Sequence, residues 1–151
     1  MESTKEKLEK ALKEAMRAND PVRKTTVRMV LSSLKLAEVE KGGALDENAQ
    51  VQLVQKEIKV RQEAIEDARR SSRSDLLEKA EAEKAVLESF LPQQLSEDEL
   101  KTLAASAIAE TGAKVPADMG RVMKFVMTQV QGRAPGDQVS RVVRDLLQNQ
   151  G

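Results

Sequence analysis

The sequence predicts an all-α protein with an N-terminal helical region followed by a C-terminal three-helix bundle. Two observations support this fold class. Apolar residues recur at the i, i+3, i+4 and i+7 spacing of an amphipathic helix, and no segment alternates apolar and polar residues as a half-buried strand would. Helix-capping residues and glycine or proline breaks divide the 151 residues into seven expected helices.

The first expected helix covers residues 4–18. A capping box formed by Ser3 and Glu6 begins it, because the hydroxyl can accept from a free backbone N–H while the carboxylate reaches back. Apolar residues then recur every four positions, at Leu8, Leu12 and Met16.

The second expected helix begins at Asp20-Pro21, a good N-cap followed by a residue that needs no partner for its missing N–H. It runs to about Glu40, and Gly42-Gly43 ends it. Its apolar residues cover more than one stripe, so we expect contacts on several of its sides. They are Val22, Val27, Met29, Val30, Leu31, Leu34, Leu36 and Val39.

A long antiparallel hairpin is expected next. Asp46 caps a third helix that runs to about Ala68, and Arg61 stands at a position where its apolar side should continue. Residues 69–74 form a short polar turn, and Ser74 is expected to cap the fourth helix. A short turn between two long helices favours antiparallel packing.

Pro92 marks the expected domain boundary, because the residue before a proline avoids helical geometry. The domains are then residues 1–92 and 93–151. The second contains helix five, opened by a capping box at Ser96, helix six, opened at Val115-Pro116, and helix seven, opened at Pro135. A domain of this size has a thin core and needs good helix packing.

Composition excludes several classes of function. The chain contains no His and no Cys, so it has no disulfide, no Cys or His zinc site and no histidine base. Its 25 basic and 25 acidic residues cancel. No apolar run approaches the ~20 residues of a membrane span, and the N-terminus lacks the apolar core of a secretory signal. These features lead us to expect a cytoplasmic protein without membrane contact.

No residues are predicted to be catalytic, cofactor-binding or metal-binding. The densest acidic positions are Glu81 with Glu83 and the run 97–99, which read as helix-surface and first-turn charges. Ser32 and Ser33 lie near Lys35 without the surrounding signature of an amidase. The phosphate-binding and dinucleotide-binding glycine motifs are absent, so no cofactor is expected.

Basic residues in the last third of the chain form the candidate binding set. They fall away from the apolar sides of helices six and seven, where they could hold phosphates; the alternative is an ordinary solvated helix surface. The set is Arg121, Lys124, Arg133, Arg141 and Arg144. The row of Met119, Met123 and Met127 is expected to line the core, with a binding groove as the alternative.

The order and spacing of several motifs resemble the YqeY-like (GatB/YqeY) family over nearly the whole chain. In that family the C-terminal half is related to the tail domain of GatB, a subunit of the tRNA-dependent amidotransferase. The motifs are Val22-Arg23, Thr26-Val27-Arg28-Met29, Lys35, Ile58-Lys59-Val60-Arg61, Arg73-Ser74-Asp75-Leu76, Glu81-Ala82-Glu83, Phe90-Leu91-Pro92-Gln93-Gln94-Leu95-Ser96-Glu97, Asp118-Met119-Gly120-Arg121-Val122-Met123 and Gly132-Arg133-Ala134.

The resemblance implies an all-helical protein whose GatB-tail-like domain contacts tRNA, with the five basic residues above as candidate RNA contacts. It also implies a link to carbon–nitrogen ligase activity with glutamine as amido donor, and partner subunits that supply the catalysis. DNA is not an expected partner. Two departures stand out: Pro135-Gly136 replaces the family's usual Asp-Gly, and Ala68 replaces a common aromatic.

Three functions therefore remain open. The first is a tRNA-binding or amidotransferase-associated helical module, with a positive surface on the last two helices. The second is a protein–protein adaptor with no RNA role, which predicts that the methionine row or the broad apolar surface of the second helix stays exposed. The third is a stand-alone amidotransferase-type enzyme, which predicts a pocket with a perturbed lysine or carboxylate pair.

Overall fold

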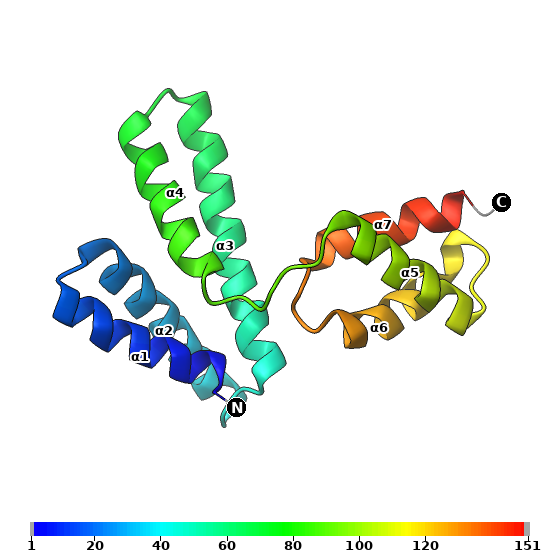
Figure 1. The fold of residues 1–151 in the computed structure, drawn as a ribbon, viewed down its shortest axis with the longest axis horizontal. Helices are drawn as coiled ribbons and strands as arrows, with labels where there is room; N and C mark the ends of the chain where they lie inside the picture. Colours follow the sequence, from blue (N-terminus) through cyan, green and yellow to red (C-terminus); the bar gives the residue numbers. More distant parts are fainter. Residues whose placement is uncertain (1, 150–151) are drawn as a thin grey trace. The chain divides into compact units, whose positions relative to one another are not determined.

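The structure of the protein is a computed structural model that describes residues 2–149. Seven α-helices and one short 3-10 helix make up this part of the chain, which contains no strand (Figure 1). The prediction of an all-α fold is therefore confirmed. The helices form two compact units, one ending at Leu91 and the other beginning at Pro92.

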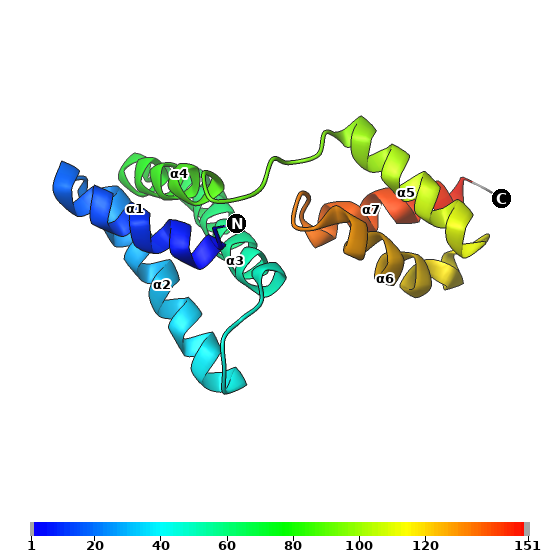
Figure 2. The same cartoon turned by 60° about the horizontal axis from the view of Figure 1, so that its bottom comes forward.

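The first unit consists of two helix pairs. One pair is formed by α1 and α2 and the other by α3 and α4, and in each pair the chain reverses direction through a short turn (Figures 1 and 2). Their bounds are α1 Thr4–Ala18, α2 Pro21–Lys41, α3 Glu47–Arg70 and α4 Ser74–Glu88.

All four helices of the first unit contribute to one core. Its centre contains fully buried side chains from each helix, and the cation of Arg23 lies over the ring of Phe90, 5.3 Å from its centroid. The buried members are Leu8, Ala11, Val27, Val30, Leu34, Val54, Leu87 and Phe90. The half of the α3–α4 pair nearest its turn buries a smaller set that includes Ile65, Ala68 and Ala80.

Hydrogen bonds fasten the start of α1 to the start of α3. The backbone N–H and hydroxyl of Thr4 both donate to the Glu47 carboxylate, and the Lys5 N–H donates to Gln50 Oε1 at 2.8 Å. The Lys5 ammonium also pairs with Glu38 of α2 at 2.8 Å. These bonds satisfy free N–H groups of the first turn of α1 and join three helices.

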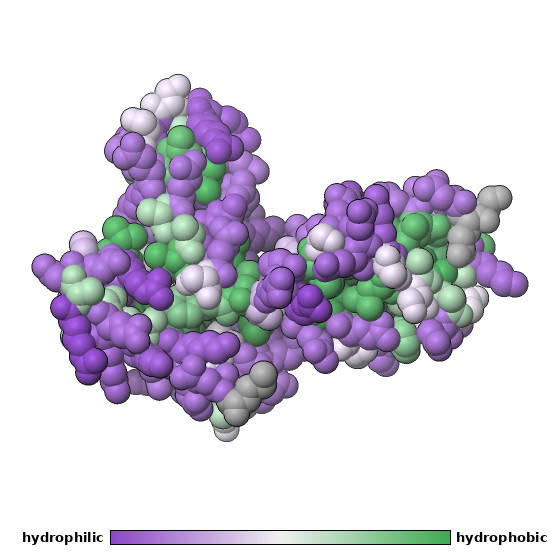
Figure 3. Space-filling model, viewed as in Figure 1, coloured by the Kyte–Doolittle hydropathy of each residue, from purple (hydrophilic) through white to green (hydrophobic). Residues whose placement is uncertain are grey.

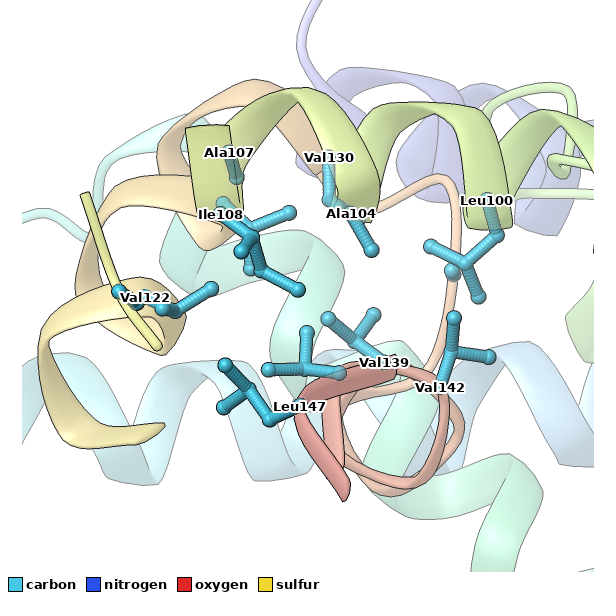
Figure 4. Close-up of a cluster of buried hydrophobic side chains, with 13 residues drawn as sticks. Leu100, Ala104, Ala107, Ile108, Val122, Val130, Val139, Val142 and Leu147 are labelled. Carbon is cyan, nitrogen blue, oxygen red and sulfur yellow. The ribbon is translucent and has the colours of Figure 1, made fainter. Parts of the chain in front are cut away.

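The second unit packs α5, α6 and α7 around a core of valine, leucine and alanine (Figure 4). Because α6 and α7 present their apolar residues on one side each, Val122, Val126 and Val130 meet Val139, Val142 and Val143 in its interior. The elements are α5 Glu97–Thr111, η1 Pro116–Asp118, α6 Met119–Val130 and α7 Gly136–Gln148.

Most expected helix starts are confirmed, two are wrong, and a third is displaced by one residue, since Pro135 is the N-cap of α7, which begins at Gly136. The side chains of Ser3, Asp20, Asp46 and Ser96 accept from backbone N–H groups as N-caps. Ser74, in contrast, is the first residue of α4 rather than its cap, and Arg73 holds the cap position without a side-chain hydrogen bond.

Helix six also begins later than expected, and the cause is local. Pro116 opens the short 3-10 helix η1, and α6 starts only at Met119. The Asp118 carboxylate accepts from the N–H groups of Lys114 and Val115, so it holds the preceding loop in a tight turn before the α-helix can begin.

Candidate functional surface

Three of the five candidate RNA-binding residues already have partners within the second unit. Arg121 pairs with Asp118 at 3.3 Å, and Arg141 lies 3.4 Å from Glu97. The Arg133 side chain donates through Nε to the Gln93 carbonyl at 2.9 Å, and its own carbonyl accepts from the Leu95 N–H. Arg133 therefore has a structural role in closing the α6–α7 turn against the segment before α5.

The other two candidates, Lys124 and Arg144, are exposed and have no ion-pair partner among residues 2–149. The Asp118 carboxylate, which lies just before α6, also has partners within the fold. Hydrogen bonds from the N–H groups of Lys114 and Val115, together with the nearby Arg121 cation, hold the pKa of the Asp118 carboxyl below its ordinary value.

The acidic positions named from the sequence also serve the fold. Glu81 pairs with Arg69 at 3.6 Å, and Glu83 pairs with Arg61 at 3.1 Å. Glu99 completes the predicted capping box with Ser96. In the part of the chain that the structure describes, no three carboxylates gather where they could hold a metal ion.

Arg61 is a buried cation between helices of the first unit. Its side chain is 8% exposed, and it pairs with Glu57 at 2.6 Å as well as with Glu83. One guanidinium nitrogen also lies 3.8 Å from the Met29 sulfur of α2. Arg61, which interrupts the apolar side of α3, thus pairs with two carboxylates. A charge can be buried when it is paired in this way.

The methionine row of α6 packs against the core, as the sequence favoured. Met119, Met123 and Met127 are partly buried and contact the interior of the second unit. This row does not offer the exposed binding groove that was its alternative interpretation.

The second helix combines the expected contacts with an exposed side that matters for function. The helices α1, α3 and α4 all contact α2, and one side of the helix stays exposed. Four large apolar side chains lie on that exposed side, and we call them the α2 row. They are Val22 at 42% exposure, Met29 at 47%, Leu36 at 61% and Val39 at 72%.

Two cations border the α2 row. Arg28 and Lys35 are exposed, are seven positions apart, and have no ion-pair partner within the described residues. By comparison, most of the surface over α1 in the view of Figure 3 is hydrophilic, and the exposed large apolar side chain of this helix is Met16. Among residues 2–149, no helix combines the length and hydropathy needed to cross a membrane.

Comparison with known proteins identifies the family. The family model described as Yqey-like protein matches residues 5–147. The chain belongs to the YqeY-like family. Two relatives share the printed name "Altered inheritance of mitochondria protein 41, mitochondrial". The one from Lachancea thermotolerans is 39% identical over 72% of this chain and 54% of its own length, and the one from Pyrenophora tritici-repentis is 30% identical over 93% and 79%.

A third relative of the same name, from Vanderwaltozyma polyspora, is 36% identical over 56% of this chain and 46% of its own length. The chain therefore spans only about half the length of two of these three relatives. Their names correct two expectations. These YqeY-like relatives are not named as amidotransferase subunits, which overturns the tRNA-binding, amidotransferase and ligase interpretation. They are named mitochondrial, which overturns the expected cytoplasmic location.

Arg28 and Lys35 belong to the motifs that resemble the family, but they are not among the five candidate binding residues predicted from the sequence. The signal that could have identified them is present in the sequence. Val22, Met29 and Leu36 recur every seven positions, and a cation directly precedes each of the last two. That spacing was masked by the second set of apolar residues on the same helix.

Proposed function

We propose that this member of the YqeY-like family is a protein-binding adaptor whose docking surface is the outer side of α2. The α2 row is the observation that carries the proposal. Four of the eight large apolar side chains that are exposed in the described chain lie on this one helix, and they share one side of it. Contiguous apolar surface on a soluble domain is typical of a protein-interaction site.

The energetics favour a covered state for this surface. Full burial of a large apolar side chain contributes about 1.5–3 kcal/mol, and each member of the α2 row is roughly half exposed. Burial of the remaining surface by a partner would therefore contribute about 1 kcal/mol for each side chain. Because the inner side of α2 already packs in the core, the helix is held rigidly and a partner does not have to order it.

The charged side chains that pack near α2 serve the fold rather than chemistry. Arg61 pairs with both Glu57 and Glu83, and Lys5 pairs with Glu38 of α2.

Site-specific photo-crosslinking in cells tests the proposal. A photoreactive amino acid at Ser32, which is exposed beside the α2 row, is expected to crosslink one discrete protein. The matched control carries the same group at Ser106, which is exposed on α5, and should not capture that protein. The crosslink from Ser32 should disappear in the Leu36→Glu variant. Equal crosslinking from both positions, or none from Ser32, would contradict a docking role for α2.

A further inference from the structure

The exposed side of α2 has the pattern of one strand of a coiled coil. When Val22 is taken as position a of a heptad, the a positions are Val22, Met29 and Leu36, and the d positions are Thr25, Ser32 and Val39. All six side chains are exposed. Residues at a and d form the seam between paired helices, where each side chain inserts between four residues of the partner.

The same helix has a second apolar side, which is buried in the core of the first unit. Val27, Val30 and Leu34 are 0% exposed and belong to the core of the first unit. Positions b, c and f of the outer heptad therefore face inward or border the core, and so does part of position e, since Thr26 is buried. The fold leaves the a and d residues of α2 exposed over about two and a half heptads, and only at Met29 does a printed contact join them to α3, where the sulfur lies 3.8 Å from an Arg61 nitrogen.

Charge beside the seam indicates which kind of helix fits. Both exposed g positions within the seam are basic, Arg28 and Lys35. Position g faces position e of a paired helix, where opposite charges select the partner. Overall α2 contains five basic and two acidic residues, and one of those acids, Glu38, is already paired with Lys5.

A second copy of this chain is a poor match for the seam. Its e positions are Thr26, which is buried, Ser33, which is partly buried, and Glu40. In a parallel dimer, only Glu40 could form an ion pair with a cation at position g of the other copy. In an antiparallel dimer, Arg28 and Lys35 would face the same cations of the other copy. Like charges at such positions disfavour self-association.

We propose that α2 binds an amphipathic helix of another protein that has large apolar residues at a and d and acidic residues at e and g. This inference rests on the proposed adaptor function and gives the chemical class of its partner. The small side chains at d, Thr25 and Ser32, leave room for leucine or phenylalanine of the partner helix. Glutamate at the flanking positions of that helix pairs with Arg28 and Lys35.

Designed peptides test this on the full chain. One three-heptad peptide has leucine at a and d and glutamate at e and g, and its matched control has lysine in place of every glutamate. Fluorescence anisotropy at low salt is expected to show the acidic peptide binding about tenfold more tightly than the basic one. Added salt should reduce that difference, because exposed charges are screened.

Charge reversal gives the decisive comparison. The double variant R28E/K35E is expected to prefer the basic peptide, while R121E/K124E, a reversal on the exposed side of α6, should keep the preference for the acidic one. The Leu36→Glu variant should lose binding of both. Equal affinity for the two peptides, or an unchanged preference in R28E/K35E, would overturn the inference.

The possible results also separate this inference from the proposed function. Crosslinking from Ser32 together with failure of both peptides would retain the adaptor function and reject the acidic helix. Absence of both signals would reject the adaptor as well. A dimer in sedimentation that Leu36→Glu dissolves would assign the seam to a second copy, and binding to anionic phosphatidylglycerol vesicles that needs Leu36 would assign it to a membrane; either result overturns the inference.

Discussion

The Arg61 guanidinium of α3 lies 3.1 Å from the Glu83 carboxylate of α4, and both side chains are largely buried. Glu57, one turn before Arg61 on the same helix, completes the pairing at 2.6 Å. The charge thus sits where α3 and α4 pack together and close to Met29 of α2. A buried pair of this kind is costly to break from one side, so it fixes how α4 packs on α3.

Removal of one partner should therefore be costly. Glu83→Gln is expected to lower the free energy of unfolding of the first unit by about 1–3 kcal/mol, because Arg61 loses a charged acceptor in a buried setting. Hydrogen exchange of α3 and α4 amides measures the loss. The matched control is Glu81→Gln, whose pair with Arg69 is at least half exposed and should contribute less than about 1 kcal/mol. Similar losses in the two variants would show that burial of the Arg61 pair has no special effect.

The two sides of α2 should differ in how strongly the same substitution destabilises the first unit. Leu34→Ala is expected to destabilise the first unit by about 2–5 kcal/mol, because Leu34 is fully buried and its loss leaves a cavity. Leu36→Ala, two positions away and 61% exposed, should change stability by less than about 0.5 kcal/mol. Urea denaturation followed by circular dichroism measures both. A large loss in Leu36→Ala would mean that this side chain serves the fold rather than a partner.

The capping box of α5 should be measurable in the same way. Ser96 accepts from the Glu99 N–H and Glu99 accepts from the Ser96 N–H, so Ser96→Ala is expected to cost about 1 kcal/mol in the second unit. Ser106→Ala is the control, since Ser106 is exposed in the interior of the same helix and alanine is the better helix former. It should leave thermal stability unchanged or slightly higher. A drop in Ser106→Ala equal to that in Ser96→Ala would contradict the capping role.

Acid should weaken the turn that precedes α6. The pKa of Asp118 is held below its ordinary value of 3.8, mainly by the N–H groups of Lys114 and Val115. A carboxylate with a lowered folded-state pKa stabilises the fold above its unfolded pKa, and that contribution disappears as pH falls through the folded value. The thermal midpoint of Asp118→Asn should therefore lie below that of the wild type at pH 7, and the gap should close as the pH falls through the lowered pKa of Asp118 in the folded protein. A gap that is constant with pH would exclude the ionised form as its cause.

Helix starts are predictable from the sequence where a single capping side chain determines the first residue of the helix. Asp20 and Ser96 act locally, within three residues of the groups they cap, so their role can be recognised without a structure. The prediction for Ser74 is wrong because a serine beside a helix start has the sequence pattern of a cap. In the fold, Arg73 pairs with Asp75 across that position and Ser74 enters the helix.

The candidate surface was harder to predict, because it depends on which side of α2 the fold covers. Val30 and Leu36 are both apolar and lie on the same helix, but only packing against α1, α3 and α4 buries the first and leaves the second exposed. The partner of Arg61 was likewise hidden, since Glu83 is 22 positions away in the sequence. The predicted basic residues were visible, but their pairing with Asp118, Glu97 and the Gln93 carbonyl was not.

Mapping where a partner helix binds tests the central claim most directly. In nitrogen–proton correlation spectra of the full chain, titration with the acidic peptide should shift amides along α2, centred on Met29, Ser32 and Leu36, and should leave α6 and α7 unchanged. The shifts should saturate, and they should be absent in Leu36→Glu. Shifts concentrated around Lys124 and Arg144, or a titration with no shift along α2, would contradict the assignment of α2 as the docking surface.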